Sequence, residues 1–124
     1  MMSENIIKVI ATDNELKFLV YQWGASFEVA TIMSGNNNLV DVTIPIIVGP
    51  YQGRIKLNGV DSGLTGNFPI HLAAGEYSML ALGIDWGGPQ DFKFDFNGVS
   101  YDSGPSVKGD GLVWYTKPIL FTVS

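Results

Sequence analysis

The residue types best suited to chemistry are few in this chain of 124 residues. There is no cysteine and only one histidine, His71, which excludes thiolate nucleophiles, disulfides and cysteine-based metal sites. His71 alternates with the apolar residues Ile70 and Leu72, so it should point to the solvated face of a strand. A Ser-His-Asp triad would have to use this histidine, yet no Gly-x-Ser-x-Gly elbow presents a serine. We therefore expect no catalytic residues and no enzyme.

Glycine-rich and acidic segments offer two other kinds of chemistry. Residues 83–89 read Gly-Ile-Asp-Trp-Gly-Gly-Pro but lack the lysine and the following helix of a phosphate-binding loop. Asp85 and Asp91 flank this turn as a glycosidase pair would, but such a pair also needs a substrate cleft. The segments 85–91 and 102–110 supply oxygen atoms of the kind that calcium prefers. Turn formation and solubility explain these acids more simply, so no metal site is assigned, with calcium kept as a candidate assisting ion.

Aromatic residues beside loop glycines are the more suggestive feature. Trp86 stands between Asp85 and two glycines, where core packing explains a large ring less readily than it does on a strand. A flat ring stacks on the apolar face of a sugar, while carboxylates and amides bond its hydroxyl groups. The alternative is that Trp86 folds back over the end of a sheet and covers the core. The predicted ligand-binding residues are Asp85, Trp86, Gln90, Asn97, Tyr101 and Asp102.

The elements that must position these residues are strands, because apolar and polar residues alternate along most of the chain. In residues 39–48 the apolar residues fall on one face, whereas Asp41, Thr43 and Pro45 fall on the other. Pro45 cannot donate a ladder hydrogen bond, so we expect an edge strand or a bulge there. The alternation recurs in five sets: Phe27, Val29, Thr31 and Met33; Phe68, Ile70 and Leu72; Leu80, Leu82 and Ile84; Phe92, Phe94 and Phe96; Ile119, Phe121 and Val123. Residues 6–10 and 16–23 are more continuously apolar, as in strands covered on both sides.

Two Asn-Gly pairs predict β-hairpins with type I′ turns. Asn97-Gly98 pairs Phe94 with Tyr101 and Lys93 with Asp102, which separates apolar from polar residues. Asn58-Gly59 predicts a second hairpin within residues 54–61. Residues 49–60 and 88–99 are identical at five of twelve positions, which shared turn chemistry explains and an internal duplication would also explain.

The length and the strand pattern predict one domain over residues 1–124. We expect an all-β fold, an antiparallel β-sandwich of jelly-roll or Greek-key type with about eight strands.

Charge and hydropathy indicate which classes of partner the chain is suited to bind. Seven basic and twelve acidic residues give a net charge of −5, which disfavours nucleic acid and anionic membranes because both demand a basic face. The N-terminus carries no basic region followed by an apolar run, and no stretch approaches the length of a transmembrane segment. We expect a cytoplasmic chain, or one exported without a cleaved signal peptide.

These observations favour a non-catalytic, lectin-like domain that binds carbohydrate. Single sites of this kind are weak, so a homo-oligomer is expected to add multivalency. Two alternatives are a structural or self-assembling protein, such as a coat, decoration or secreted component, and a membrane-active toxin. An assembly protein predicts a flat exposed apolar patch, whereas a toxin predicts aromatic residues clustered on one rim.

Overall fold

Strands make up the secondary structure of residues 5–35, 39–60, 62–87, 89–103, 106–107 and 111–124, which the computed structural model describes. No helix occurs among these residues. The strands are β1 (Asn5–Gln22), β2 (Ala25–Ser34), β3 (Val40–Val48), β4 (Ile55–Gly59), β5 (Leu64–Asn67), β6 (Ile70–Leu72), β7 (Gly75–Asp85), β8 (Pro89–Phe96), β9 (Val99–Asp102), β10 (Ser106–Val107), β11 (Gly111–Tyr115) and β12 (Ile119–Val123).

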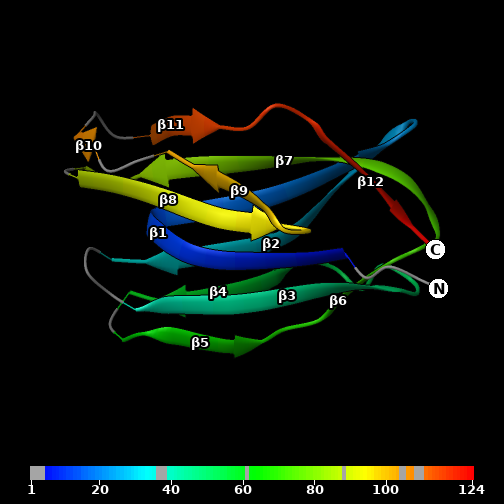
Figure 1. Cartoon of the computed structure of the whole chain (residues 1–124), viewed down its shortest axis with the longest axis horizontal. Coiled ribbons are helices and arrows are strands. Elements are labelled where there is room, and N and C mark those ends of the chain that lie inside the picture. Colours follow the sequence, from blue (N-terminus) through cyan, green and yellow to red (C-terminus); the bar gives the residue numbers. More distant parts are fainter. Residues whose placement is uncertain (1–4, 36–38, 61, 88, 104–105, 108–110) are drawn as a thin grey trace.

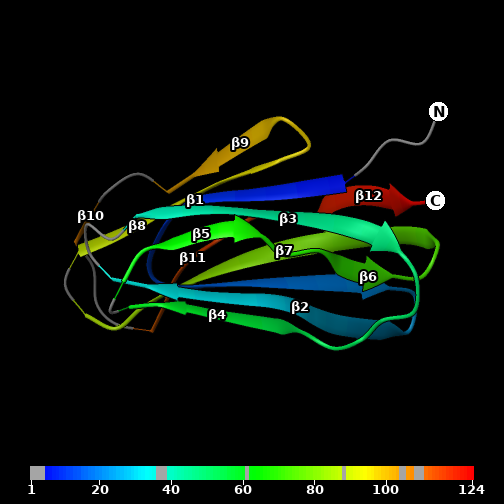
Figure 2. The same ribbon diagram turned by 90° about the horizontal axis from the view of Figure 1, so that it is seen from below.

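The long strand β1 organises the fold, because each half of it lies between a different pair of neighbours. Its first half pairs with β3 and β8, and its second half pairs with β2 and β7. The register against β8 shifts between Val9 and Ala11, which leaves Ile10 as an extra residue. Such a bulge bends a strand and increases its twist. The sheet therefore turns at β1 and curls nearly into a barrel around the core (Figures 1 and 2).

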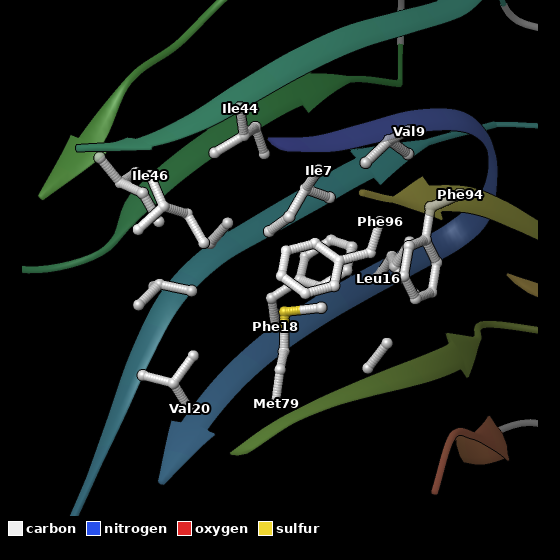
Figure 3. Packing of buried hydrophobic residues seen from close by; sticks show 14 of the residues in the cluster. Ile7, Val9, Leu16, Phe18, Val20, Ile44, Ile46, Met79, Phe94 and Phe96 are labelled. Carbon is white, nitrogen blue, oxygen red and sulfur yellow. The ribbon is translucent and has the colours of Figure 1, made fainter. Parts of the chain in front are cut away.

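The core fills the space between the two halves of the curled sheet. Apolar side chains from β1, β3, β7 and β8 point toward one another there (Figure 3). Among the largest fully buried side chains are Phe18, Phe92 and Phe94. Burying one such side chain contributes about 1.5–3 kcal/mol. The predicted core face of β8 is confirmed, because Phe92, Phe94 and Phe96 are all buried.

The strand pairing differs from the sequence prediction in direction and in number. The all-β class is confirmed, but the described residues contain twelve strands, where about eight were expected. The sheet is mixed, since β4 runs parallel to β2 and both β5 and β6 run parallel to β3. Parallel neighbours need long crossover connections, and no local turn signal in the sequence reports them.

Pro45 shows how β3 accommodates a residue without an amide hydrogen. Of the two alternatives expected for Pro45, an edge strand or a bulge, the edge strand is wrong. β1 pairs with one side of β3, and β5 and β6 pair with the other. The β5 ladder ends at Thr43 and the β6 ladder begins at Ile46. Pro45 therefore lies in the gap between two ladders, where a missing donor costs nothing.

The two predicted hairpins have opposite outcomes. The Asn97-Gly98 hairpin is confirmed with the predicted register, including Phe94 opposite Tyr101, and both turn residues have positive φ angles of 52° and 83°. The Asn58-Gly59 hairpin is wrong, because β4 pairs parallel with β2, and the Asn58 side chain accepts a hydrogen bond from the Val60 amide instead. The two similar segments thus fold differently where both are described, since one ends in a parallel strand and the other in a hairpin, which favours shared turn chemistry over a repeated unit.

Two strands present faces that simple alternation assigned incorrectly. In β2 the register against β1 shifts so that Val29 is an extra residue, and Val29, Ala30, Thr31 and Ile32 are all buried. The predicted common face of Phe27 through Met33 is therefore broken at the bulge. In β7 the predicted set Leu80, Leu82 and Ile84 does share one face, but that face is the half-buried outer one. The core-facing residues include Met79 and Ala81.

Candidate functional site

An open groove of about 630 Å³ lies between β9 and the segment that runs from β11 into β12. Its lining combines aromatic rings with charged and hydroxyl side chains. The residues important for the argument are Tyr101, Asp102, Trp114, Tyr115, Thr116 and Lys117. Tyr101 and Asp102 were predicted as ligand residues, whereas the other four were not.

The rings of Tyr101 and Trp114 are held in place by phenylalanines of the core. Tyr101 stacks on Phe94 with the ring centroids 5.0 Å apart, and Trp114 stacks on Phe92 at 5.9 Å with an interplanar angle of 5°. Each ring thus has one face fixed against a buried side chain. Preorganised rings of this kind bind a flat apolar surface without a large entropic loss.

Gly83 makes room for this stacking. It lies opposite Trp114 in the β7–β11 ladder, and a Cβ atom at this position would lie 2.8 Å from the Phe92 ring. That distance is too short for any real contact, so only glycine lets Phe92 occupy its place beneath Trp114. From the sequence, this glycine was expected only to form part of a turn.

The segment between β11 and β12 closes one side of the groove. Thr116 exchanges two hydrogen bonds with Ala81, one from its amide to the carbonyl oxygen and one from the Ala81 amide to its hydroxyl, both 3.1 Å long. Thr116 is buried, while Lys117 and Pro118 are exposed. Thr116 therefore anchors this segment to β7, and the segment contributes Thr116 and Lys117 to the lining of the groove.

A row of four carboxylates extends from the groove into the protein. Asp102 on β9 is exposed and interacts with Asp91 on β8, which lies opposite Asp13 on β1. Burial raises the pKa of Asp91, and the charge of Asp102 raises it further, whereas Lys93 lowers it. Burial also raises the pKa of Asp13, reinforced by the charges of Asp85 and Asp91. Asp13 did not figure in the sequence prediction because its partners are 72 and 78 residues away.

Asp13→Asn is expected to stabilise the protein at neutral pH. The folded state raises the pKa of Asp13 above its ordinary value of 3.8 and so favours the protonated form. Its contribution to stability is thus present below that value and is lost as the pH rises through the folded pKa. The variant should be more stable than the wild type at pH 7 and gain nothing at pH 3. Urea unfolding at both pH values measures this, and an equal gain at both would contradict it.

The predicted ligand residues Asp85 and Trp86 lie together at the end of β7. Asp85 is buried, and its Oδ1 atom accepts a hydrogen bond of 3.2 Å from the Gly87 amide, while Oδ2 has no hydrogen-bond partner within the described part of the chain. The Trp86 side chain is 49% exposed, and its amide donates to the Asn14 side chain at 2.8 Å. Trp86 therefore does not simply cover the core, but neither residue lines the groove.

Asn97 and Gln90 complete the predicted set. Asn97 lies at the far tip of the β8–β9 hairpin, where its Oδ1 atom accepts from the Ile6 amide at 2.8 Å and its Nδ2 atom donates to Asn5 at 2.9 Å. Both ends of this amide thus join the hairpin to the start of β1. The side chain of Gln90 lies outside the described residues. Of the predicted residues whose side chains are described, Tyr101 and Asp102 alone line the groove.

The described residues also bear on metals and membranes. Among them, no group of three or more His, Cys, Asp or Glu side chains is arranged to hold a metal ion. Nor do these residues form any helix that is long and apolar enough to cross a bilayer. The class of protein defined so far is an all-β domain with a mixed, nearly barrel-like sheet and an aromatic groove. Comparison with protein families, curated proteins and solved structures finds no match to this chain.

Proposed function

We propose that the chain is a non-catalytic carbohydrate-binding domain whose site is the groove between β9 and β11–β12. The observation that carries this proposal is the pairing of fixed aromatic rings with a carboxylate and an amine in one open groove, which Tyr101, Trp114, Asp102 and Lys117 line. Rings stack on the apolar face of a pyranose, while the charged groups bond its hydroxyls.

Two features of the groove favour a sugar over other small molecules. The groove is open, which suits a polar ligand that keeps part of its hydration. Its charged side chains include both signs, Asp102 and Lys117, and this mixture suits a neutral ligand rich in hydroxyl groups better than a strongly charged one.

The arrangement of the tryptophans argues against the membrane-active alternative. Trp23 is fully exposed at the turn between β1 and β2. The Trp86 amide instead donates a hydrogen bond to the side chain of Asn14, near the middle of β1. Trp23 lies nine positions after Asn14 and directly follows β1, which places it about 30 Å away. Trp114 packs in the groove, so the three rings do not share one rim.

The direct test is the titration of intrinsic tryptophan fluorescence with a panel of mono- and disaccharides, in calcium and in EDTA. The wild type should show a saturable shift with at least one sugar. Asp102→Asn removes a charged hydrogen-bond acceptor, worth about 1.5–3 kcal/mol, so the affinity should fall by tenfold or more. Trp86→Ala is the matched control, because Trp86 lies outside the groove, and it should keep the wild-type affinity.

Other outcomes assign the site differently. Loss of binding in Trp86→Ala, with Asp102→Asn unaffected, would move the site to the end of β7. A shift that disappears in EDTA would add calcium to the site. The absence of a shift with every sugar in the panel would contradict carbohydrate binding.

A further inference from the structure

Strand β7 carries apolar side chains on both of its faces. In β7 the inner face includes Met79 and Ala81, and the outer face carries Leu80, Leu82 and Ile84. In β1 the outer residue Leu19 lies opposite Leu80. Strands that are apolar on both faces are typical of sheets covered on both sides.

The pairing register extends this outer face over four adjacent strands. Ile84 on β7 lies opposite Leu112 on β11, and Leu82 lies opposite Tyr115. Leu120 on β12 points to the same side, since its neighbours Ile119 and Phe121 pack on the core. β11 and β12 both lie along β7 (Figure 1). We call this surface the outer face: Leu19, Leu80, Leu82, Ile84, Leu112, Tyr115 and Leu120.

The outer face is strongly exposed along the strands β11 and β12. The exposed fraction is 58% for Leu112, 69% for Tyr115 and 80% for Leu120. Single exposed leucines are ordinary, but a contiguous apolar patch across several strands marks an interaction site. At ~200 Å² of surface for one large side chain, these three residues expose on the order of 400 Å², and the half-buried residues of β7 lie between them. That is about half of the ~800 Å² that each partner buries in a standard interface.

The charges along the β1 side of the outer face are balanced. Lys17 lies 3.2 Å from Glu15 and 3.5 Å from Glu28, measured from its Nζ atom to a carboxylate oxygen, and Arg54 lies 3.0 Å from Glu28. Two acids and two bases thus neutralise one another within a single chain. A surface that must meet a copy of itself avoids a single sign of charge, because like charges brought together are costly.

We propose that the outer face is the interface of a symmetric dimer of this chain. A second copy fits because the outer face is apolar at its centre and the charges on its β1 side are neutralised within the chain. Tyr115 and Leu120 belong to both the outer face and the groove, so the grooves of the two copies would open at the margin of the interface. The inference does not rest on carbohydrate binding, since the interface is argued from the outer face alone.

The test is analytical ultracentrifugation of the whole chain over a concentration series. The wild type should sediment as two chains. Leu112→Glu places a charge in the interface without touching the groove, and it should raise the dissociation constant of the dimer at least about thirtyfold. Leu39→Glu is the matched control, because Leu39 is 64% exposed but immediately precedes β3, away from the outer face. It should leave the dimer intact.

A second variant and a folding check keep the result decisive. Circular dichroism establishes that each variant is folded, and Leu120→Glu replaces Leu112→Glu if the latter is not. A monomeric wild type at every concentration would overturn the proposal, as would a dimer that survives both substitutions or dissociates equally in Leu39→Glu. Because the readout is mass, a failure here is distinguishable from a failure of sugar binding.

Discussion

Phe94→Ala is expected to lower the free energy of unfolding by about 3–5 kcal/mol, the range for removing a buried aromatic ring. Phe94 is fully buried and contacts three other rings: Phe18 edge-on at 5.0 Å, Tyr101 in a stack at 5.0 Å and Trp114 edge-on at 6.2 Å. Its loss would open a cavity and also release Tyr101 from its support. Urea or thermal unfolding of the purified variant measures the cost.

The matched control for this prediction is Phe94→Leu, which keeps most of the buried volume. It should cost clearly less than the alanine variant, because the residual cavity is smaller. If carbohydrate binds in the groove, the alanine variant should also bind more weakly, since Tyr101 loses its fixed orientation. If Phe94→Ala lowered the free energy of unfolding by less than about 1 kcal/mol, the ring contacts of Phe94 would not be a main source of stability.

Asn97→Ala is expected to cost about 3–4 kcal/mol of stability for two separate reasons. Asn97 has a φ angle of 52°, a left-handed conformation that alanine adopts at a cost of about 1–2 kcal/mol. Its side chain also makes hydrogen bonds to Ile6 and Asn5, each with a net worth of about 1 kcal/mol. Chemical unfolding at neutral pH measures the sum.

Asn97→Gly separates these two contributions. Glycine adopts the left-handed turn freely, so this variant loses only the hydrogen bonds and should be more stable than Asn97→Ala. The pair of variants also tests whether Asn97 binds a ligand, which is the role predicted from the sequence alone. If both variants kept wild-type stability but lost sugar binding, Asn97 would be a ligand residue and not part of the framework.

Local signals in the sequence determined those features that depend on neighbouring residues. The Asn97-Gly98 turn fixed the register from Lys93 to Asp102, because an Asn-Gly pair suits a type I′ turn and apolar residues sort to one face only in that register. The alternation in β3 and β8 gave their buried faces for the same reason, since successive side chains of a strand point to opposite sides. The all-β class follows from such patterns, summed over the chain.

Only the tertiary structure decided how distant strands meet. The Asn58-Gly59 pair has the same chemistry as Asn97-Gly98, yet β4 pairs parallel with β2, because packing against a distant strand outweighs a local turn preference. The bulges at Ile10 and Val29 reverse the faces on which side chains lie, and no local pattern marks them.

The candidate site depended on the tertiary structure for the same reason. Tyr101 and Trp114 are joined through Phe92 and Phe94, which stack beneath them, and that contact exists only once β8 and β11 flank the same core. Sequence alone could show that aromatic and acidic residues were present near loops. Which of them share a groove is set by the curl of the sheet around β1, a property of the packed whole and not of any segment.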